Sequence, residues 1–211
     1  MLPKAQQALW PELSQLPRGL VLYGGTAIAL RLAHRQSLDF DFFSSEPVAA
    51  EELLRSVSFL SGSKVLQSTD NTLTVVVERG GPVKLSFFGG LTIGRVGEPE
   101  ATEDGVLQIA SMLDLAGVKA AVVSQRAEAK DYLDLLAMFE HGISLGSALG
   151  AARALYAERY NPIVTLKALS YFDDGDLRSL SAAQKAKLTS LASAHLEIPQ
   201  IARVSDVLSA L

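Results

Sequence analysis

The first half of the chain changes repeatedly between two hydrophobic periods, one typical of helices and one typical of strands. Leu9 and Leu13 recur at a spacing that places them on one side of a helix. In residues 38–43 polar and apolar residues alternate, so Phe40 and Phe42 are expected on the buried face of a strand. This mixture indicates an α/β fold of the α+β kind. The predicted elements, in chain order, are a helix over 3–16, a strand over 20–23, a helix over 27–34, a strand over 38–43, a helix over 49–57 and strands over 72–78 and 83–88.

From about residue 105 the pattern becomes helical. Ala and Leu dominate this half, and Gly or Pro residues separate its apolar stretches. The change in composition predicts two domains, a mixed α/β core over 1–105 and a helical region over 106–211. The predicted helices of the second half cover 111–125, 129–141, 145–159, 163–171 and 181–195.

Composition excludes several classes of protein and site. The chain has 211 residues, of which 48% are hydrophobic and 20% are charged, as in an ordinary globular protein. It contains no cysteine, so disulfides, thiolate catalysis and zinc–cysteine sites are ruled out. The formal net charge is −4, so any contact with RNA requires a local basic patch. The candidates for such a patch are Arg31, Arg35, Arg126, Lys130, Arg153 and Arg159.

The sequence shows no feature that predicts a membrane location. The N-terminal residues lack a basic segment followed by an apolar run, as a signal peptide would have. The apolar stretch 109–123 contains Asp114 and Lys119, which makes it a poor membrane span. We therefore expect a cytoplasmic protein with no membrane partner.

Two acids stand out on the predicted strand 38–43. Asp39 and Asp41 are two residues apart, so both carboxylates are expected on one face of the strand. Two close carboxylates repel each other unless a cation lies between them, and Mg²⁺ accepts such oxygen ligands while keeping positions for phosphates. Alone the motif is weak, since 23 acidic residues produce such a pair about once by chance. Asp174 and Asp176 form a second pair, in a turn, and are assigned no metal role.

Gly24, Gly25 and Thr26 connect the strand 20–23 to the following helix. Glycines at such a junction let the backbone approach a ligand closely, and the start of a helix offers unpaired N–H groups to a phosphate. The Thr26 hydroxyl could add a hydrogen bond. The alternative is a plain strand–helix turn with Thr26 as a cap. The order of strand, Gly-Gly-Thr, helix and Asp-x-Asp strand favours a phosphate loop beside metal-binding acids.

A second group of charges lies in the helical half. Lys119, Arg126 and Lys130 are spaced by seven and four residues, so they share one face if the helix is continuous. Such a cationic stripe could face a triphosphate. The alternative is a solvated face whose charges pair with Asp131 and Asp134.

Together these motifs resemble the nucleotidyltransferase superfamily, and within it the AbiEii-type toxin family of abortive-infection and toxin–antitoxin systems. The resemblance covers 20–43 and 111–135, and it implies a nucleotidyltransferase-fold mixed sheet flanked by helices and followed by a helical region. It is carried by Gly24-Gly25-Thr26, by Arg35-x-Ser37-x-Asp39-Phe40-Asp41, and by Ser111, Asp114, Lys119, Arg126, Lys130, Asp131 and Asp134.

The resemblance implies a function as well as a fold. It implies transfer of a nucleoside monophosphate from a nucleoside triphosphate (NTP), with Mg²⁺ or Mn²⁺, to a hydroxyl of tRNA or of a protein, and an antitoxin partner. Asp39 and Asp41 would bind the metal. The expected nucleotide ligands are Gly24, Gly25, Thr26, Ser37, Arg126 and Lys130, and the other expected catalytic residues are Lys119, Asp131 and Asp134.

The resemblance breaks at one position. Many nucleotidyltransferases have a third carboxylate on a later strand, and the best-aligned residue here is Ser86. A serine carries no charge and does not act as a general base unaided. Two alternatives therefore stay open: a degenerate fold that binds a nucleotide or a protein without catalysis, and a plain structural module with solvated acids.

Overall fold

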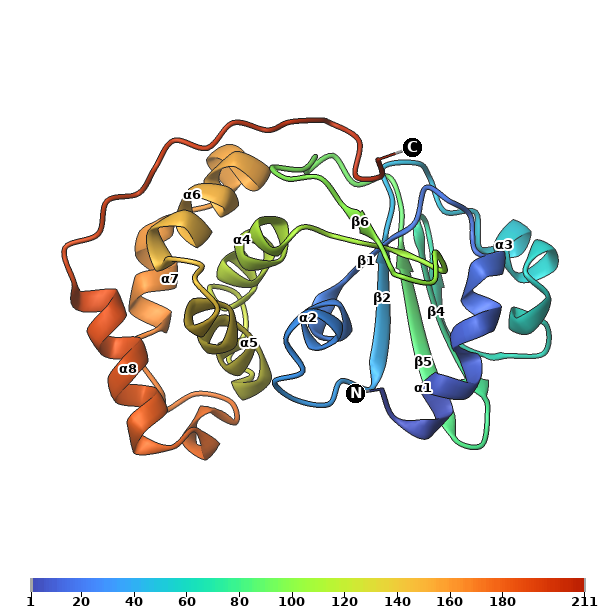
Figure 1. Ribbon diagram of the computed structural model, residues 1–211, viewed down its shortest axis with the longest axis horizontal. Coiled ribbons are helices and arrows are strands. Elements are labelled where there is room, and N and C mark those ends of the chain that lie inside the picture. Colours follow the sequence, from blue (N-terminus) through green and yellow to red (C-terminus); the bar gives the residue numbers. More distant parts are fainter. Residues whose placement is uncertain (1, 211) are drawn as a thin grey trace. The chain divides into compact units, whose positions relative to one another are not determined.

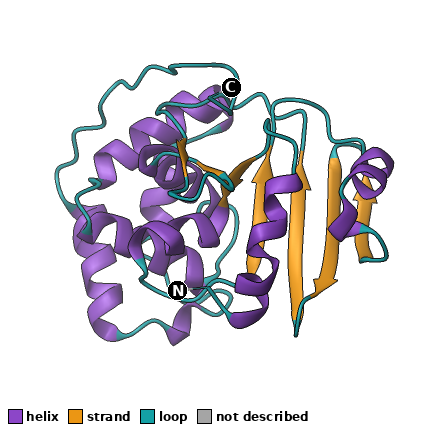
Figure 2. Ribbon diagram, turned by 45° about the vertical axis from the view of Figure 1, so that its right-hand side comes forward, coloured by secondary structure: helices purple, strands orange, loops and turns teal. Residues whose placement is uncertain are grey.

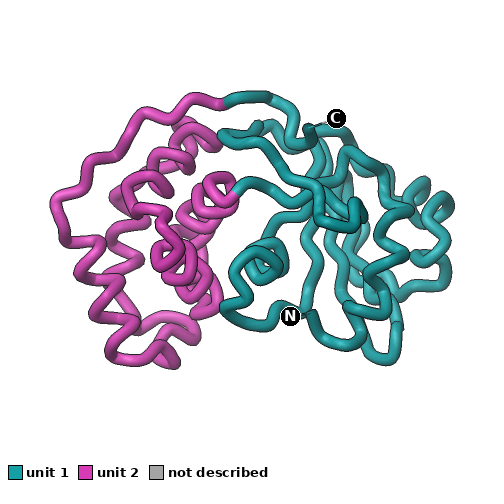
Figure 3. Tube along the Cα trace, viewed as in Figure 1, with its two compact units in different colours: residues 1–111, 204–211 teal, residues 112–203 magenta. Residues whose placement is uncertain are grey.

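A computed structural model describes residues 2–210. They belong to two compact units, the first formed by Met1–Ser111 with Val204–Leu211 and the second by Met112–Arg203 (Figure 3). The sequence predicts a division near residue 105, whereas the units divide between Ser111 and Met112. The sequence also assigns all of 106–211 to the helical region, whereas residues from Val204 onward belong to the first unit.

A seven-stranded mixed sheet forms the centre of the first unit, in the order β3-β4-β5-β2-β1-β7-β6. The pairs β2–β5 and β1–β7 are parallel, and the other neighbours are antiparallel. The mixed sheet flanked by helices that the sequence predicts is thereby confirmed. The strands are β1 (Val21–Tyr23), β2 (Asp39–Phe43), β3 (Lys64–Thr69), β4 (Thr72–Glu78), β5 (Pro82–Phe88), β6 (Glu100–Ala101) and β7 (Gln108–Ile109).

Helices lie on both faces of this sheet (Figure 1). On one face the rings of Phe40, Phe42 and Phe87 pack in a fully buried core, and Trp10 contacts Phe40 from the helices on that side. The opposite face carries α2 and the alternate, more polar residues of β2. The helices of the first unit are α1 (Lys4–Leu9), the 3₁₀ turn η1 (Trp10–Gln15), α2 (Gly24–Leu32), α3 (Ala50–Ser56) and η2 (Ser58–Leu60).

Every helix or strand described in the second unit is a helix, and residues 194–203 follow the last one without regular structure (Figure 2). Its central helix α4 packs along α6, where Gly117 lies so close to Ala151 that a Cβ on Gly117 would be 2.9 Å from the Ala151 Cβ. The backbone at Glu197 and Pro199 crosses α6 at Gly146 and Gly150, where there is likewise no room for a side chain. The elements are α4 (Met112–Val122), α5 (Ala129–Glu140), α6 (Leu145–Tyr156), η3 (Ala157–Arg159), α7 (Pro162–Ala168), η4 (Leu177–Ser179) and α8 (Ala182–Ser193).

Within residues 2–210, no single helix has both the length and the apolar character that a membrane span requires. The pair Ala129–Glu140 and Leu145–Arg159 reaches that length and composition only when taken together, and it bends by 118°.

Candidate active site

The two acids of β2 lie on the face of the sheet that carries α2. Asp39 and Asp41 are half-buried, whereas Phe40 and Phe42 between and after them are fully buried. The alternation of an extended strand produces this arrangement, because successive side chains point to opposite faces. Both carboxylates therefore share one face, as the sequence predicts.

Strand β5 places two further polar residues beside these acids. In the parallel register Lys84 lies next to Asp39, and Ser86 lies next to Asp41. The Lys84 ammonium is 2.9 Å from Asp39 Oδ2. Ser86 is buried and contributes a hydroxyl beside Asp41. Among the described residues, no group of three His, Cys, Asp or Glu side chains is arranged to hold a metal. The face thus offers two carboxylates, one of them paired with a lysine.

The first residue of α2 contacts the acid pair directly. Gly24 has a φ of +72°, a conformation that favours glycine. A Cβ at this position would collide with the Asp41 carboxylate. The sequence predicts a helix over 27–34 preceded by a loop, but α2 already begins at Gly24. The Gly-Gly-Thr segment is consequently the first turn of the helix, and it lies against Asp41.

Arg35 and Ser37 cover the same helix start. A Cβ on Gly25 would collide with the Arg35 guanidinium and would lie 2.9 Å from Ser37 Oγ. Arg35 also donates to the carbonyl of Gln36 at 2.9 Å. A positive charge and a hydroxyl are therefore held at the positive end of a helix, an arrangement that favours an anion. Arg35 belongs to the motif that carries the family resemblance, but it was not among the expected site residues. Its spacing of four before Asp39 is the signal that could have added it.

Thr26 has a different role from the one expected. Its side chain is fully buried, and its hydroxyl donates a hydrogen bond to the backbone carbonyl of Asp39. The hydroxyl thus ties α2 to β2 and is not presented to a phosphate. Any contact of Thr26 with a phosphate would have to come from its backbone N–H.

A buried ionic cluster occupies the second unit. Lys119 of α4 lies between two acids of α5, with its ammonium 2.6 Å from Asp131 Oδ1 and 2.7 Å from Asp134 Oδ2. The side chains of both acids are completely buried, and that of Lys119 is 7% exposed. Arg126 adds a second cation, with Nε 2.8 Å from Asp131 Oδ2 and Nη2 3.2 Å from Asp131 Oδ1. Buried charges must be paired in this way, because an unpaired one carries a large desolvation cost.

The cluster keeps Asp131 ionised. Burial by itself raises the pKa of this carboxyl, but the hydrogen bond from Arg126 and the charge of Lys119 outweigh it and leave the pKa below its usual value. Both carboxylate oxygens accept hydrogen bonds from cations. Asp131 is therefore poorly suited to remove a proton and well suited to position Lys119 and Arg126.

The predicted cationic stripe does not form, because the helix is not continuous. Helix α4 ends at Val122 and α5 begins at Ala129, so Arg126 lies in the turn between them. Lys130 is exposed on α5 and pairs with Glu128 at 2.8 Å instead of joining Lys119. The charges are also not the solvated face of the alternative interpretation, since the centre of the cluster is buried.

The expected site residues consequently form two groups, one in each unit. Within the first unit, the start of α2 and the strands β2 and β5 hold Gly24, Gly25, Thr26, Ser37, Asp39 and Asp41, to which Lys84 and Arg35 are added. Within the second unit, α4, α5 and the turn between them hold Lys119, Arg126, Asp131 and Asp134, with Lys130 outside the cluster.

Comparison with known proteins found a family model that matches most of the chain and a related sequence. A family model described as "Nucleotidyl transferase AbiEii toxin, Type IV TA system" matches residues 8–197. An uncharacterized protein from Aquifex aeolicus (strain VF5) is 33% identical over 159 residues, which is 72% of this chain and 73% of that protein.

Two solved structures share the fold. MenT4, a nucleotidyltransferase toxin from Mycobacterium tuberculosis H37Rv, has a TM-score of 0.61 and 16% identity, covering 90% of this chain and 80% of its own. A putative nucleotidyltransferase from H. pylori has a TM-score of 0.56 and 19% identity, covering 90% of both chains.

Proposed function

Since the chain belongs to the AbiEii family of nucleotidyl transferase toxins, we propose that it transfers a nucleoside monophosphate from an NTP to a hydroxyl of tRNA or of a protein. The observation that carries the proposal is the contact between the start of α2 and the acid pair. Gly24 lies against Asp41, and Arg35 and Ser37 cover the next residue, so an anion site adjoins two carboxylates on one face. A nucleotide phosphate with a divalent ion needs both features together.

The residues of β2 fit Mg²⁺ or Mn²⁺ better than they fit an ion enclosed by protein ligands. Asp39 and Asp41 supply two carboxylates, and such ions keep their other positions for water and substrate phosphates. When bound, the ion supplies positive charge where negative charge develops on the reacting phosphate. When the ion binds, the Lys84 ammonium has to move away from the Asp39 carboxylate or share that carboxylate with the ion.

In the proposed reaction, the acceptor oxygen attacks the α-phosphorus while the bond to pyrophosphate breaks, pyrophosphate leaves, and the acceptor's proton passes to solvent water. Arg35, Ser37 and the backbone at Gly24 hold the triphosphate in line for this attack. Asp131 and Asp134 orient Lys119, and neither removes the proton, because Lys119 and Arg126 already occupy them. Within the second unit, Arg126 is the cation that we propose contacts a phosphate, because its side chain is 48% exposed whereas Lys119 is enclosed by Asp131 and Asp134.

A second function is favoured by the residues of β5. Lys84 neutralises part of Asp39, and a hydroxyl rather than an acid lies beside Asp41. These residues suit a protein that binds a nucleotide without transferring it. In either case the family suggests an antitoxin as a partner.

Label transfer tests the proposal. The protein is incubated with Mg²⁺, each α-labelled NTP in turn, and total RNA or total protein, and we expect one acceptor class to become labelled. Asp39→Asn and Asp41→Asn should each abolish labelling. Asp70→Asn should retain it, because this exposed acid lies in the β3–β4 turn, at the opposite end of the sheet from Asp39. A folded protein that binds Mg-NTP but labels nothing would favour the second function.

A further inference from the structure

A small pocket opens in the second unit beside the ionic cluster. Its volume is about 190 Å³, below the 300–1,000 Å³ of pockets that enclose a whole drug-sized ligand. It therefore fits one ring system and not an entire nucleotide. Its lining comes from the turn after α4, from Tyr132 of α5, and from the segment between α7 and η4.

The walls of this pocket are fixed to each other. Gly175 has a φ of +52° and approaches the carbonyl of Ala127 so closely that no side chain would fit there. One residue later, Asp176 Oδ1 accepts a hydrogen bond of 2.6 Å from the backbone N–H of Ala129 and caps α5. The pocket is thus preformed, which lowers the entropy lost when a ligand binds.

The lining combines an aromatic surface with polar groups at the edge. Tyr171 lines the pocket although 54% of its surface is exposed, so its ring is available for stacking. Gln125 and Asp174 also line it, and no hydrogen bond or ion pair within 2–210 engages their side chains. An aromatic face with an unpaired carboxylate and an amide suits a flat heterocycle that donates hydrogen bonds.

Charge on one side of the pocket indicates what is attached to that heterocycle. Arg126 lines the pocket and is oriented by its two hydrogen bonds to Asp131. Its side chain remains 48% exposed, so its guanidinium can still meet an anion. A ring bound beside Asp174 would place its substituent toward a fixed positive charge, as a nucleotide requires.

We propose that this pocket binds a nucleobase that carries an exocyclic amino group, with Asp174 accepting its hydrogen bonds and Tyr171 stacking on the ring. Adenine, cytosine and guanine present such a group, whereas uracil presents a single N3–H donor between two carbonyl oxygens that the carboxylate repels. The inference rests on the proposed function, since a protein that transfers a nucleotide must recognise a nucleobase of its NTP or of its acceptor.

Calorimetry with ATP, CTP, GTP and UTP in the presence of Mg²⁺ tests the pocket on the whole chain. At least one amino-bearing NTP should bind about tenfold more tightly than UTP, because uracil lacks the amino donor and places two carbonyl oxygens beside its one N–H, facing a charged acceptor. Asp174→Ala should remove about tenfold of this preference. Tyr171→Ala should weaken every NTP alike, because stacking does not depend on the base edge.

Asp173→Ala is the matched control. Asp173 is the neighbouring acid, faces Arg178 at 3.7 Å and does not line the pocket, so its loss changes the charge but not the proposed contact. If the wild type binds Mg-NTP and Asp174→Ala changes the base preference no more than Asp173→Ala does, the pocket inference is wrong and the proposed function stands. If the wild type binds no NTP, the proposed function itself fails.

The base could belong to the NTP or to an acceptor strand, and a second titration distinguishes them. Short single strands that end in A, C, G or U are titrated into the protein after saturation with Mg-NTP. A terminal-base preference that Asp174→Ala removes, with NTP preference unchanged, would assign the pocket to the acceptor base. If Asp173→Ala also removes the base preference, both for the NTPs and for the single strands, the assignment to Asp174 is wrong.

Discussion

At the scale of single residues, the pairing of Lys84 with Asp39 sets the charge of the acid pair. The two side chains are 40% and 34% exposed, so the ion pair is partly screened and contributes about 0.2–1 kcal/mol. Because a divalent ion must compete with this ammonium, Lys84→Met should raise the affinity for Mn²⁺ up to about fivefold. Titration of Mn²⁺ without nucleotide measures it, and Lys64→Met, an exposed lysine at the start of β3, is the control. Unchanged Mn²⁺ affinity in Lys84→Met would show that Lys84 does not compete for the site.

Asp131 provides a prediction about stability and pH. Asp131→Asn keeps the size of the side chain but removes the charge of one of the two acids beside Lys119 and the 2.8 Å ion pair of Arg126, which should cost about 3 kcal/mol of unfolding free energy at pH 7. The folded pKa of Asp131 is lowered, so its contribution is present above the unfolded value of about 3.9 and is lost as pH falls through the folded pKa. The difference between wild type and variant should therefore shrink below about pH 4.

Urea unfolding at pH 7, 5 and 3.5 measures this difference. Asp70→Asn, which changes an exposed acid in the first unit, should show almost no difference at any of these pH values. A gap between Asp131→Asn and the wild type that stays constant down to pH 3.5 would mean that the charge of Asp131 does not stabilise the fold.

The residues of the acid pair were predictable from the sequence, and their partners were not. Alternation along a single strand is enough to place Asp39 and Asp41 on one face. The contact of Lys84 with Asp39 depends on the parallel register of β5 beside β2, which no local pattern contains. The burial of Lys119 was not predictable from local sequence either, because it results from the packing of α4 against α5.

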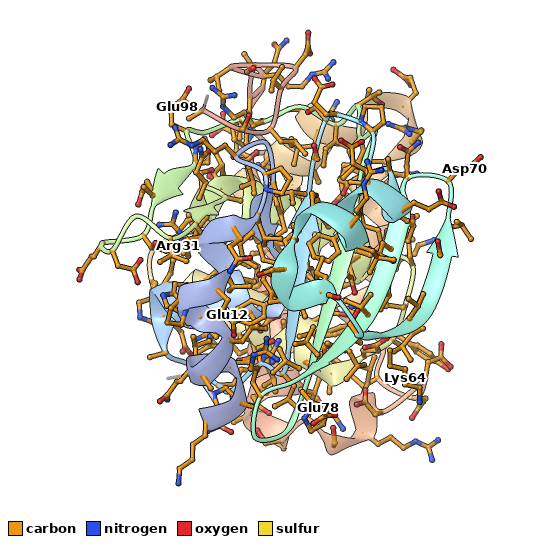
Figure 4. The ribbon with its side chains drawn as sticks, turned by 90° about the vertical axis from the view of Figure 1, so that its right-hand side faces the viewer. Glu12, Arg31, Lys64, Asp70, Glu78 and Glu98 are labelled. Carbon is orange, nitrogen blue, oxygen red and sulfur yellow. The ribbon has the colours of Figure 1, made fainter. Side chains whose placement is uncertain are left out.

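At the scale of elements, strands β1, β2, β4 and β5 were predicted, whereas the exposed strand β3 and the two-residue strands β6 and β7 were not. Strand β3 lies at the edge of the sheet, between Lys64 and the turn at Asp70, and every one of its residues is exposed (Figure 4). It has no buried face, so it has no hydrophobic alternation to read. The helix over 3–16 is divided because Pro11 has no backbone N–H to continue it, and the chain turns into η1 there.

The turn between α4 and α5 supports a prediction at this scale. Gly175→Ala should lower the unfolding free energy by about 2–3 kcal/mol, because it combines a left-handed φ with a collision at the Ala127 carbonyl. Gly142→Ala is the matched control, since Gly142 also has a positive φ but nothing within 4 Å of an added Cβ. It should cost only about 1 kcal/mol. Thermal or urea unfolding gives the loss of unfolding free energy for each variant, and the difference between the two losses isolates the contact with Ala127. Equal losses would mean that the close approach of Gly175 to Ala127 is not needed for stability.

At the scale of the whole molecule, the sequence predicted the change from mixed to helical structure but not the return of the chain to the first unit. Residues 194–210 contain apolar residues, but these follow no sustained helical or alternating period and Pro199 interrupts them, so nothing local marks them as part of a sheet domain. Their place is set by long-range hydrogen bonds. Arg95 exchanges backbone bonds with Val204 and Ser205, and its side chain donates to the carbonyls of Val207 and Ser209.

These contacts make the first unit dependent on residues 204–211. Leu208 is 1% exposed, and its backbone N–H donates to Ser45 Oγ at 3.0 Å. Ending the chain after Arg203 would expose the apolar surface beneath Leu208 and would leave the guanidinium of Arg95 without two acceptors. At about 2 kcal/mol for the leucine and about 1 kcal/mol for each hydrogen bond, the first unit should lose about 4–6 kcal/mol of unfolding free energy.

Hydrogen exchange identifies which unit responds to the truncation. Amides of the first unit, β1 and β7 above all, should exchange faster in the shortened protein, whereas amides of α4 and α6 in the second unit should keep their protection. Leu208→Ala should reproduce part of the loss, and Val207→Ser, at a half-exposed side chain, should reproduce almost none. If amide protection in both units is the same before and after truncation, the returning segment adds no stability. Equal loss in both units would mean that they unfold as one cooperative body, because a local contact in one unit would then stabilise the whole chain.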